Sequence, residues 1–68
     1  MKLKIGVEVW YRGETVTITG IEYVYATHKH TKIMEEIPWE LKDKCIFTLS
    51  NGKTTLGLHI KTVEPVLN

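Results

Sequence analysis

The sequence predicts an all-β fold, a small barrel of five strands, from three observations. Two β-rich runs meet at Asn51-Gly52, which is the strongest hairpin signal in the chain. Apolar residues alternate strictly with other residues from Leu3 to Tyr11, as they do in a half-buried strand. The alternation slips by one residue at Gly20, where a strand that serves two faces of a barrel would bend.

Length and composition bound the class of protein. The 68 residues suffice for one domain, 1–68, which would bury only about 60% of the surface that its unfolded chain exposes. Nine lysines and arginines against eight acidic residues leave a net charge of +1, which argues against a strongly phosphate-seeking protein. Cys45 is the single cysteine, and neither a signal peptide nor an apolar run of about 20 residues is found. These features predict a cytoplasmic protein without an internal disulfide.

The first half of the chain predicts two strands. The first is Leu3–Tyr11, with Trp10 on the face opposite the core. A polar turn at 12–14 leads into the second strand, in which Gly20 is expected to form a β-bulge. Residues on both sides of the bulge are expected to face the core: Val16, Ile18, Ile21 and Tyr23.

Residues 26–44 are predicted to form one long loop. Pro38 disfavours helix at the residue before it but suits a first helical position, so a single helical or 3₁₀ turn is expected from Pro38 to Asp43. Loops of this length in so small a domain tend to be functional. The loop carries a basic cluster, an apolar pair and an acidic pair, which are His28, Lys29, His30 and Lys32, then Ile33-Met34, then Glu35-Glu36.

The second half of the chain predicts a hairpin and an edge strand. The hairpin runs from Cys45 to Ile60, and Asn51-Gly52 is expected to be a two-residue type I′ turn, which needs φ > 0 at both positions. A last strand, 61–66, contains Pro65 and is therefore expected at the edge of a sheet.

Five strands in this order resemble the SH3-like small barrels, the architecture of SH3, Tudor and KOW modules. Residues 6–21 read GVEVWYRGETVTITGI, which is similar to the strand, glycine-containing turn and Val/Ile-rich strand that open such domains. Residues 58–66 read LHIKTVEPV and resemble their last two strands. The resemblance covers most of the chain and implies a five-stranded barrel that binds a ligand, without indicating a specific family.

Partner-binding residues are predicted among the aromatic and loop side chains. Large aromatic residues are enriched at interfaces, and Trp10 lies on the polar face of its strand while Trp39 lies in the long loop. The alternative for these residues is packing, with Trp39 as a lid over an open end of the barrel. The predicted partner-binding set is Trp10, Tyr25, His28, Lys29, His30, Lys32, Met34 and Trp39.

The basic residues support a second interpretation. Lys29, His30 and Lys32 beside Trp10 would combine cations with a stacking aromatic, as proteins that hold single-stranded nucleic acid do. The acidic residues of the same loop would repel phosphate unless they faced elsewhere. The alternative is an ordinary solvated surface, on which lysines protect sheet edges from aggregation.

The sequence contains no constellation typical of an enzyme or a metal site. No base is predictable near Cys45, and no Ser-His-Asp arrangement or Gly-rich phosphate loop is found. His28, His30, His59 and Cys45 are able to ligate a metal, but they lack the close pair spacing of zinc sites. We therefore expect no metal, no cofactor and no catalytic activity.

The expected function is that of a non-catalytic, cytoplasmic module that binds another protein, with the long loop supplying specificity. A barrel of this size without a tail or second domain is typical of small accessory or inhibitor proteins from phages and mobile elements, which mask a surface of a host complex. Two alternatives stay open. One is a nucleic-acid-binding barrel, and the other is a structural subunit that homodimerises through its edge strands.

Overall fold

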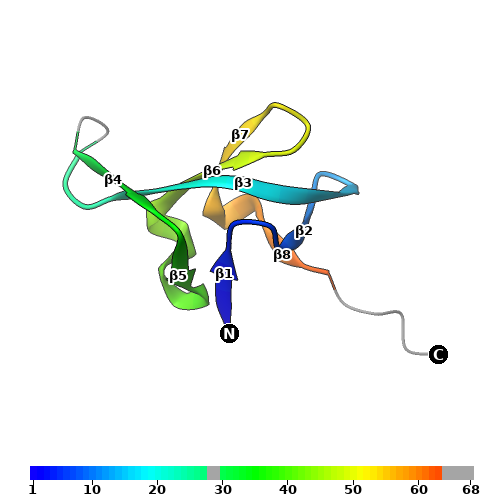
Figure 1. The fold of residues 1–68 in the computed structure, drawn as a ribbon, viewed down its shortest axis with the longest axis horizontal. Helices are drawn as coiled ribbons and strands as arrows, with labels where there is room; N and C mark the ends of the chain where they lie inside the picture. The colour runs from blue at the N-terminus through cyan, green and yellow to red at the C-terminus, as the bar shows by residue number, and fades with distance from the viewer. Residues whose placement is uncertain (28–29, 64–68) are drawn as a thin grey trace.

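The computed structural model describes residues 1–27 and 30–63, and over these ranges the chain is an all-β domain (Figure 1). Its strands form two sheets, and two short 3₁₀ helices connect strands in the second half of the chain. In chain order the elements are β1 (Lys2–Lys4), β2 (Glu8–Tyr11), β3 (Glu14–Val24), β4 (Thr31–Met34), β5 (Glu36–Pro38), η1 (Trp39–Lys44), β6 (Cys45–Leu49), β7 (Thr54–Leu56), η2 (Gly57–His59) and β8 (Lys61–Thr62).

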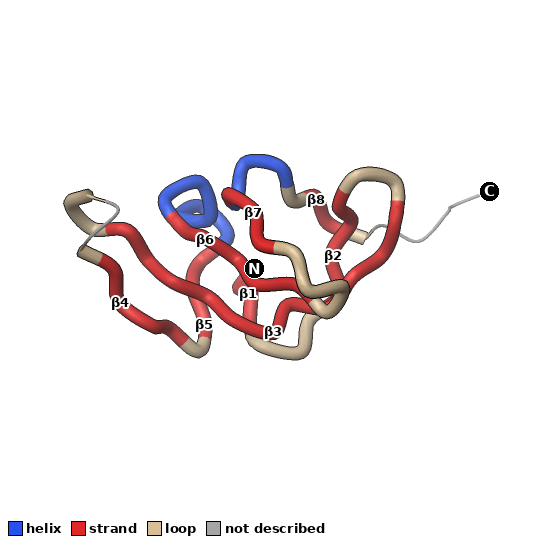
Figure 2. The backbone as a smooth tube through the Cα atoms, turned by 90° about the horizontal axis from the view of Figure 1, so that it is seen from above, coloured by secondary structure: helices blue, strands red, loops and turns tan. Residues whose placement is uncertain are grey.

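The long strand β3 organises the larger sheet. The strand order is β7-β6-β3-β2-β8, and β4 also pairs with β3. β2 lies along the first half of β3, whereas β4 lies along the second half, from Ile21 to Val24. Figures 1 and 2 show β3 crossing the molecule with β2 and β8 near one end and β4 near the other. Neither sheet closes on itself, so the described chain forms two open sheets of eight strands in place of the predicted five-stranded barrel.

The predicted first strand is interrupted at Gly6. This glycine has a φ of +93°, a left-handed conformation that an extended strand does not contain. The chain turns there, and Leu3–Tyr11 splits into β1 and β2. β1 lies outside the larger sheet and pairs with β5 in a sheet of two strands. Alternation does not reveal this break, because the apolar residues keep the same spacing on both sides of the turn.

The predicted long loop, 26–44, contains β4, β5 and η1. β4 forms a hairpin with β3, and β5 pairs with β1 from the start of the chain. Both strands are too short to show a period of two clearly, and the partner of β5 is distant in sequence. The helical turn expected from Pro38 to Asp43 is confirmed as η1: Pro38 precedes it in an extended conformation, and Trp39 begins it.

The bend predicted at Gly20 is confirmed. The register between β3 and β6 shifts between Ile18 and Gly20. Ile18 and Ile21 are both buried as a result, although they would face opposite sides of an unbroken strand. Tyr23, further along, packs partly buried against the core. The Cβ that Gly20 lacks would lie 3.2 Å from the side chain of Thr48, so glycine also avoids crowding here.

The type I′ turn lies in the hairpin of β2 and β3 and not in that of β6 and β7, where it was expected. Arg12 and Gly13 have φ values of +49° and +84°, so the type I′ turn joins β2 to β3. At Asn51-Gly52 only the glycine has a positive φ, +83°. The Gly52 N–H donates to the Leu49 carbonyl at 2.9 Å and closes a longer loop in which glycine alone is left-handed. The type I′ prediction for Asn51-Gly52 was therefore wrong, although the hairpin itself is present.

Replacing Gly52 with valine is expected to lower the free energy of unfolding by about 1–2 kcal/mol. A β-branched residue is strained at a φ of +83°. A Cβ at this position would meet no atom within 4 Å, so backbone strain is the main effect. Urea unfolding of Gly52→Val beside Gly52→Asn measures that strain, because asparagine tolerates positive φ. Equal stabilities of the two variants would contradict the assigned conformation.

The end of the predicted hairpin also departs from a plain strand. β7 ends at Leu56, and Gly57–His59 form η2 before the chain enters β8. β8 contains Lys61 and Thr62, so it covers only the start of the predicted strand 61–66. Residues 64–66 of that prediction lie outside the described residues.

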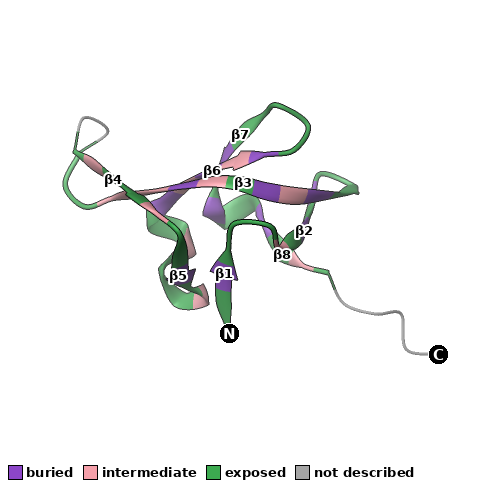
Figure 3. Cartoon of the chain, in the orientation of Figure 1, coloured by how far each residue is buried: buried purple, intermediate pink, exposed green. Residues whose placement is uncertain are grey.

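One cluster of buried side chains draws on both sheets. Figure 3 shows buried positions along β3 and β6 of the larger sheet and on β1 of the smaller one. Ile60, next to β8, closes the cluster on the side of η2. The interior is therefore filled without a closed barrel. Its members are Leu3, Val9, Tyr11, Val16, Ile18, Ile21, Ile37, Cys45, Phe47, Leu49 and Ile60.

Candidate functional site

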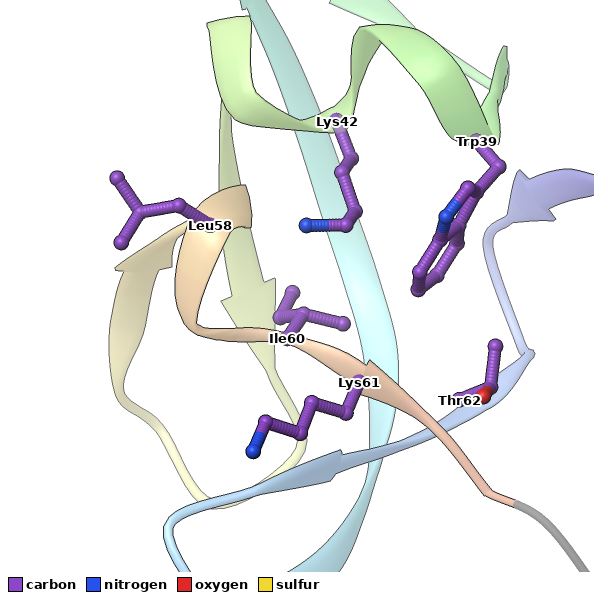
Figure 4. A pocket seen from close by; sticks show the side chains of 6 residues that line it. All are labelled: Trp39, Lys42, Leu58, Ile60, Lys61 and Thr62. Carbon is purple, nitrogen blue, oxygen red and sulfur yellow. The ribbon is translucent and has the colours of Figure 1, made fainter.

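A groove of about 480 Å³ lies where η1, η2 and β8 meet. Figure 4 shows the Trp39 indole extending from η1 toward β8, with Lys42 beside it and Leu58 on the far side of Lys42. The groove is thus built from both 3₁₀ helices and an edge strand. Its lining consists of Trp39, Lys42, Leu58, Ile60, Lys61 and Thr62.

Trp39 is positioned by the chain on either side of it. Pro38 is extended, with φ −62° and ψ 144°, and Trp39 is the first residue of η1. The Trp39 backbone N–H donates to the Met1 carbonyl at 3.0 Å, which continues the pairing of β5 with β1. The side chain is partly buried and packs against the core cluster. It therefore supports the fold and also lines the groove.

The charged group of Lys42 is engaged in contacts within the protein. Its Nζ lies 2.8 Å from Oδ1 of Asp43 and donates to the Gly57 carbonyl at 2.9 Å. The same nitrogen lies 5.0 Å from the centroid of the Trp39 ring, which is a cation–π distance. The Lys42 side chain is only 14% exposed. It ties η1 to η2 and offers little charge to a ligand.

Gly57 allows η2 to approach η1 closely. It is buried, and a Cβ at this position would collide with the Lys42 carbonyl and lie 2.9 Å from Cε2 of Phe47. The absent side chain therefore provides the space in which the two helices meet. Leu58 and Ile60 line the groove and lie within one to three residues of Gly57, so this contact also sets their positions.

Trp10 lies next to the same edge strand but on another surface. In the pairing of β2 with β8, Trp10 opposes Lys61 and Val9 opposes Thr62. Because Val9 is buried, Thr62 shares the inner face, while Trp10 and Lys61 share the outer face. Trp10 is 42% exposed, as its place on the polar phase predicted. The two tryptophans thus lie on different sides of β8.

The other predicted partner-binding residues lie at the opposite end of β3. The rings of Tyr25 and His30 meet edge to face, with centroids 6.1 Å apart. Lys32 is exposed on β4, whereas Met34 is partly buried and packs against the core. The described members of the predicted set therefore occupy separate regions. Two members lie outside the described residues: His28 and Lys29.

The sequence indicates Trp39 as a binding residue but not the residues around it. Leu58 and Ile60 share one phase of the alternating run, but η2 turns Leu58 outward, and it is 52% exposed whereas Ile60 is buried. No motif in the sequence sets Lys42 or Lys61 apart from the other lysines. The available signal was Gly57, because an isolated glycine in an apolar run often marks a bend or a close backbone approach.

The Cys and His residues near the groove show no arrangement for catalysis or metal binding among the described residues. Cys45 is buried, and its thiol donates to the Leu41 carbonyl at 3.4 Å. Burial raises the pKa of the Cys45 thiol, which keeps it protonated and poorly nucleophilic at neutral pH. His59 is exposed on η2. Within residues 1–27 and 30–63, no three His, Cys, Asp or Glu residues form a group that could hold a metal ion.

No helix in the described part of the chain is long and apolar enough to cross a membrane.

No protein-family model, curated protein or solved structure shows a significant match to this chain. The candidate site is therefore assigned from its own geometry.

Proposed function

We propose that this protein is a non-catalytic binding module whose groove receives a segment of another protein. The observation that carries the proposal is a partly buried tryptophan, Trp39, in a groove where the adjacent cation, Lys42, is already neutralised. An aromatic side chain in a recessed site is the typical anchor of a protein interface. The groove favours apolar side chains of a partner, with hydrogen bonds at its rim.

The distribution of charge favours a protein over a nucleic acid. Single-stranded nucleic acid is held by several cations beside stacking aromatics. Of the two lysines in the lining, Lys42 is engaged internally and Lys61 faces solvent. His30 and Lys32, the described members of the basic cluster, lie along the other half of β3 from Trp10. The lining therefore offers one accessible cation, Lys61, which gives little affinity for phosphate.

The order of the elements supports a binding role by analogy. The larger sheet has an element order similar to that of the SH3-like modules that the sequence resembles. In chain order it contains β2, a short turn, the bent β3, a long connection, β6, a hairpin to β7 and the short edge strand β8. We infer that the larger sheet is an open relative of that architecture, with β1, β4 and β5 as additions. Analogy of fold does not by itself identify a ligand.

A cytoplasmic location is part of the same proposal and rests on the single cysteine.

Capture from a cell extract by immobilised wild type and by Leu58→Glu tests the proposal. A charge at this exposed position of the groove opposes apolar contact without disturbing the core. The matched control is Leu56→Glu, which places the same charge on an exposed leucine of the outer sheet face. We expect a protein that wild type and the control retain and that Leu58→Glu loses, with retention that survives nuclease and high salt.

Two other results would contradict the proposal. Retention that nuclease abolishes, and that falls steeply with salt, would support the nucleic-acid alternative, because phosphate contacts release counterions. Equal behaviour of Leu58→Glu and Leu56→Glu would place the binding surface outside the groove.

A further inference from the structure

The groove beside Trp39 runs along the free edge of β8. Its lining includes three consecutive residues of the chain, which are Ile60, Lys61 and Thr62. Successive side chains of an extended segment point to opposite faces, so a groove that all three residues line follows the edge of the backbone. One edge of β8 pairs with β2, and no strand of the described ranges pairs with the other edge. The groove therefore lies against unpaired backbone.

The pairing of β2 shows which backbone groups of β8 face the groove. The Ile18 N–H donates to the Val7 carbonyl at 2.9 Å, so residue 7 points its backbone groups toward β3. Because this direction alternates along an antiparallel strand, Trp10 points its groups toward β8, where it opposes Lys61. The residues on either side of Lys61 then point their N–H and C=O groups away from β2, into the groove.

Three of these groups are placed to bond a ligand. The Ile60 N–H already donates to the Gly57 carbonyl at 3.0 Å, which agrees with the direction derived from β2. The Ile60 C=O and both backbone groups of Thr62 make no backbone hydrogen bond within residues 1–27 and 30–63. Free donors and acceptors at the edge of a sheet are the groups that bind an added strand.

The two faces of this edge differ in chemistry. On the inner face, Ile60 is buried and Trp39 is partly buried, so a side chain that enters beside them meets apolar surface. On the outer face, Lys61 is exposed and takes part in neither of the ion pairs of the described chain. Glu8 lies on the same face of the sheet, but no ion pair joins it to Lys61. An apolar side chain therefore fits the inner face, and a carboxylate fits the outer one.

We propose that the groove receives an extended segment of the partner, which adds to the larger sheet as a further strand beside β8. Alternate residues of the segment are apolar and face Trp39, and the residues between them are acidic and face Lys61. The Thr62 N–H and the Ile60 C=O bond to the backbone of the segment. This inference rests on the proposed function, because it specifies the conformation and the chemistry of what the groove binds.

Removal of the Thr62 N–H tests the strand pairing. Thr62→Pro removes this donor, and proline is tolerated in an edge strand where the N–H faces away from the sheet. Thr62→Val is the matched control, because it keeps the N–H and changes only the side chain. The probe is a synthetic peptide of about six residues, the usual length of a strand, capped at both ends, in which leucine alternates with glutamate. Titration calorimetry measures its binding, and thermal unfolding verifies that both variants fold.

We expect wild type and Thr62→Val to bind the peptide with similar dissociation constants. Thr62→Pro should bind it about tenfold more weakly or worse, which corresponds to about 1.4 kcal/mol. Replacing the glutamates of the peptide with lysines should also weaken its binding to the wild type, because Lys61 then faces like charge. The proposal is overturned by a wild type that does not bind the peptide at millimolar concentration, by equal binding of Thr62→Pro and Thr62→Val, or by equal binding of the two peptides.

Hydrogen exchange in the wild type tests the same pairing without a substitution. The Thr62 amide should exchange about tenfold more slowly when the peptide is bound, because its N–H gains an acceptor. The Lys61 amide is the internal control, since it already faces Trp10 in the pairing with β2 and should change little. A Thr62 amide that exchanges equally fast with and without bound peptide would contradict the proposal.

Leu58→Glu separates this inference from the proposed function. Peptide binding that Leu58→Glu abolishes and Thr62→Pro leaves intact would keep the groove as the binding site and overturn the strand pairing. Binding that neither substitution changes would place the peptide outside the groove and contradict both. Sedimentation velocity of the wild type without peptide tests a second copy as the occupant. An association that Thr62→Pro abolishes would assign the edge to that copy and overturn the proposal.

Discussion

Gly57→Ala is expected to lower the free energy of unfolding by about 3 kcal/mol or more, a large part of the stability of so small a domain. The added Cβ would collide with the Lys42 carbonyl, a backbone group that cannot rotate away, and would lie 2.9 Å from Cε2 of Phe47. Either η2 moves away from η1 and loses the bond from Lys42 Nζ, or Phe47, the largest fully buried side chain, is displaced. Urea unfolding measures the loss.

The matched control for this prediction is Gly20→Ala. Its Cβ would lie 3.2 Å from side-chain atoms of Thr48, which can adjust, so we expect a change within about 1 kcal/mol. In a Trp10→Phe background, the fluorescence of Trp39 should also differ between Gly57→Ala and its parent, because the groove is displaced. A Gly57→Ala protein as stable as wild type would mean that η2 does not approach η1 as described.

Trp39→Ala is expected to weaken binding of the captured partner roughly 30-fold or more, which corresponds to about 2 kcal/mol. The variant removes the aromatic wall of the groove and leaves Lys42 without its ring contact. It should also lower the free energy of unfolding by about 1–2 kcal/mol, less than for a fully buried tryptophan, because the side chain is partly buried. Titration calorimetry and urea unfolding of the same preparation measure the two effects separately.

Two variants control for the loss of packing. Trp39→Phe retains an aromatic ring against the core and should recover most of the stability and part of the affinity. Trp10→Ala removes the tryptophan on the outer face and should change the affinity by a factor of about three or less. If Trp10→Ala abolishes binding and Trp39→Ala does not, the partner surface is the outer face of β2 and β8.

Local signals in the sequence predicted some of the features that depend on neighbouring residues, although the type I′ turn expected at Asn51-Gly52 was not among them. The slip in alternation at Gly20 corresponds to the register shift in β3, and the proline before Trp39 corresponds to the start of η1. The pairing of β1 with β5 was not predictable in this way, because it depends on two short segments that are distant in sequence. The left-handed conformation of Gly6, which separates β1 from β2, produces no change in the apolar pattern.

The candidate site was predictable only in part, for a related reason. Trp39 and Trp10 stood out as large aromatics outside the core pattern, and Trp10 is indeed exposed. The groove around Trp39 depends on the contact between η1 and η2, which Gly57 permits and which no period in the sequence indicates. Charge counting also did not show that Lys42 is neutralised by internal contacts.

NMR spectra recorded with and without the captured partner test most directly whether the groove is the binding surface. The amide and indole signals that change on addition of the partner identify the residues at the contact. We expect the largest changes at the Trp39 indole N–H and at the backbone amides of Leu58, Ile60 and Thr62. Unchanged signals at these positions, together with changes at Trp10 or along β4, would contradict the assignment of the groove as the binding surface.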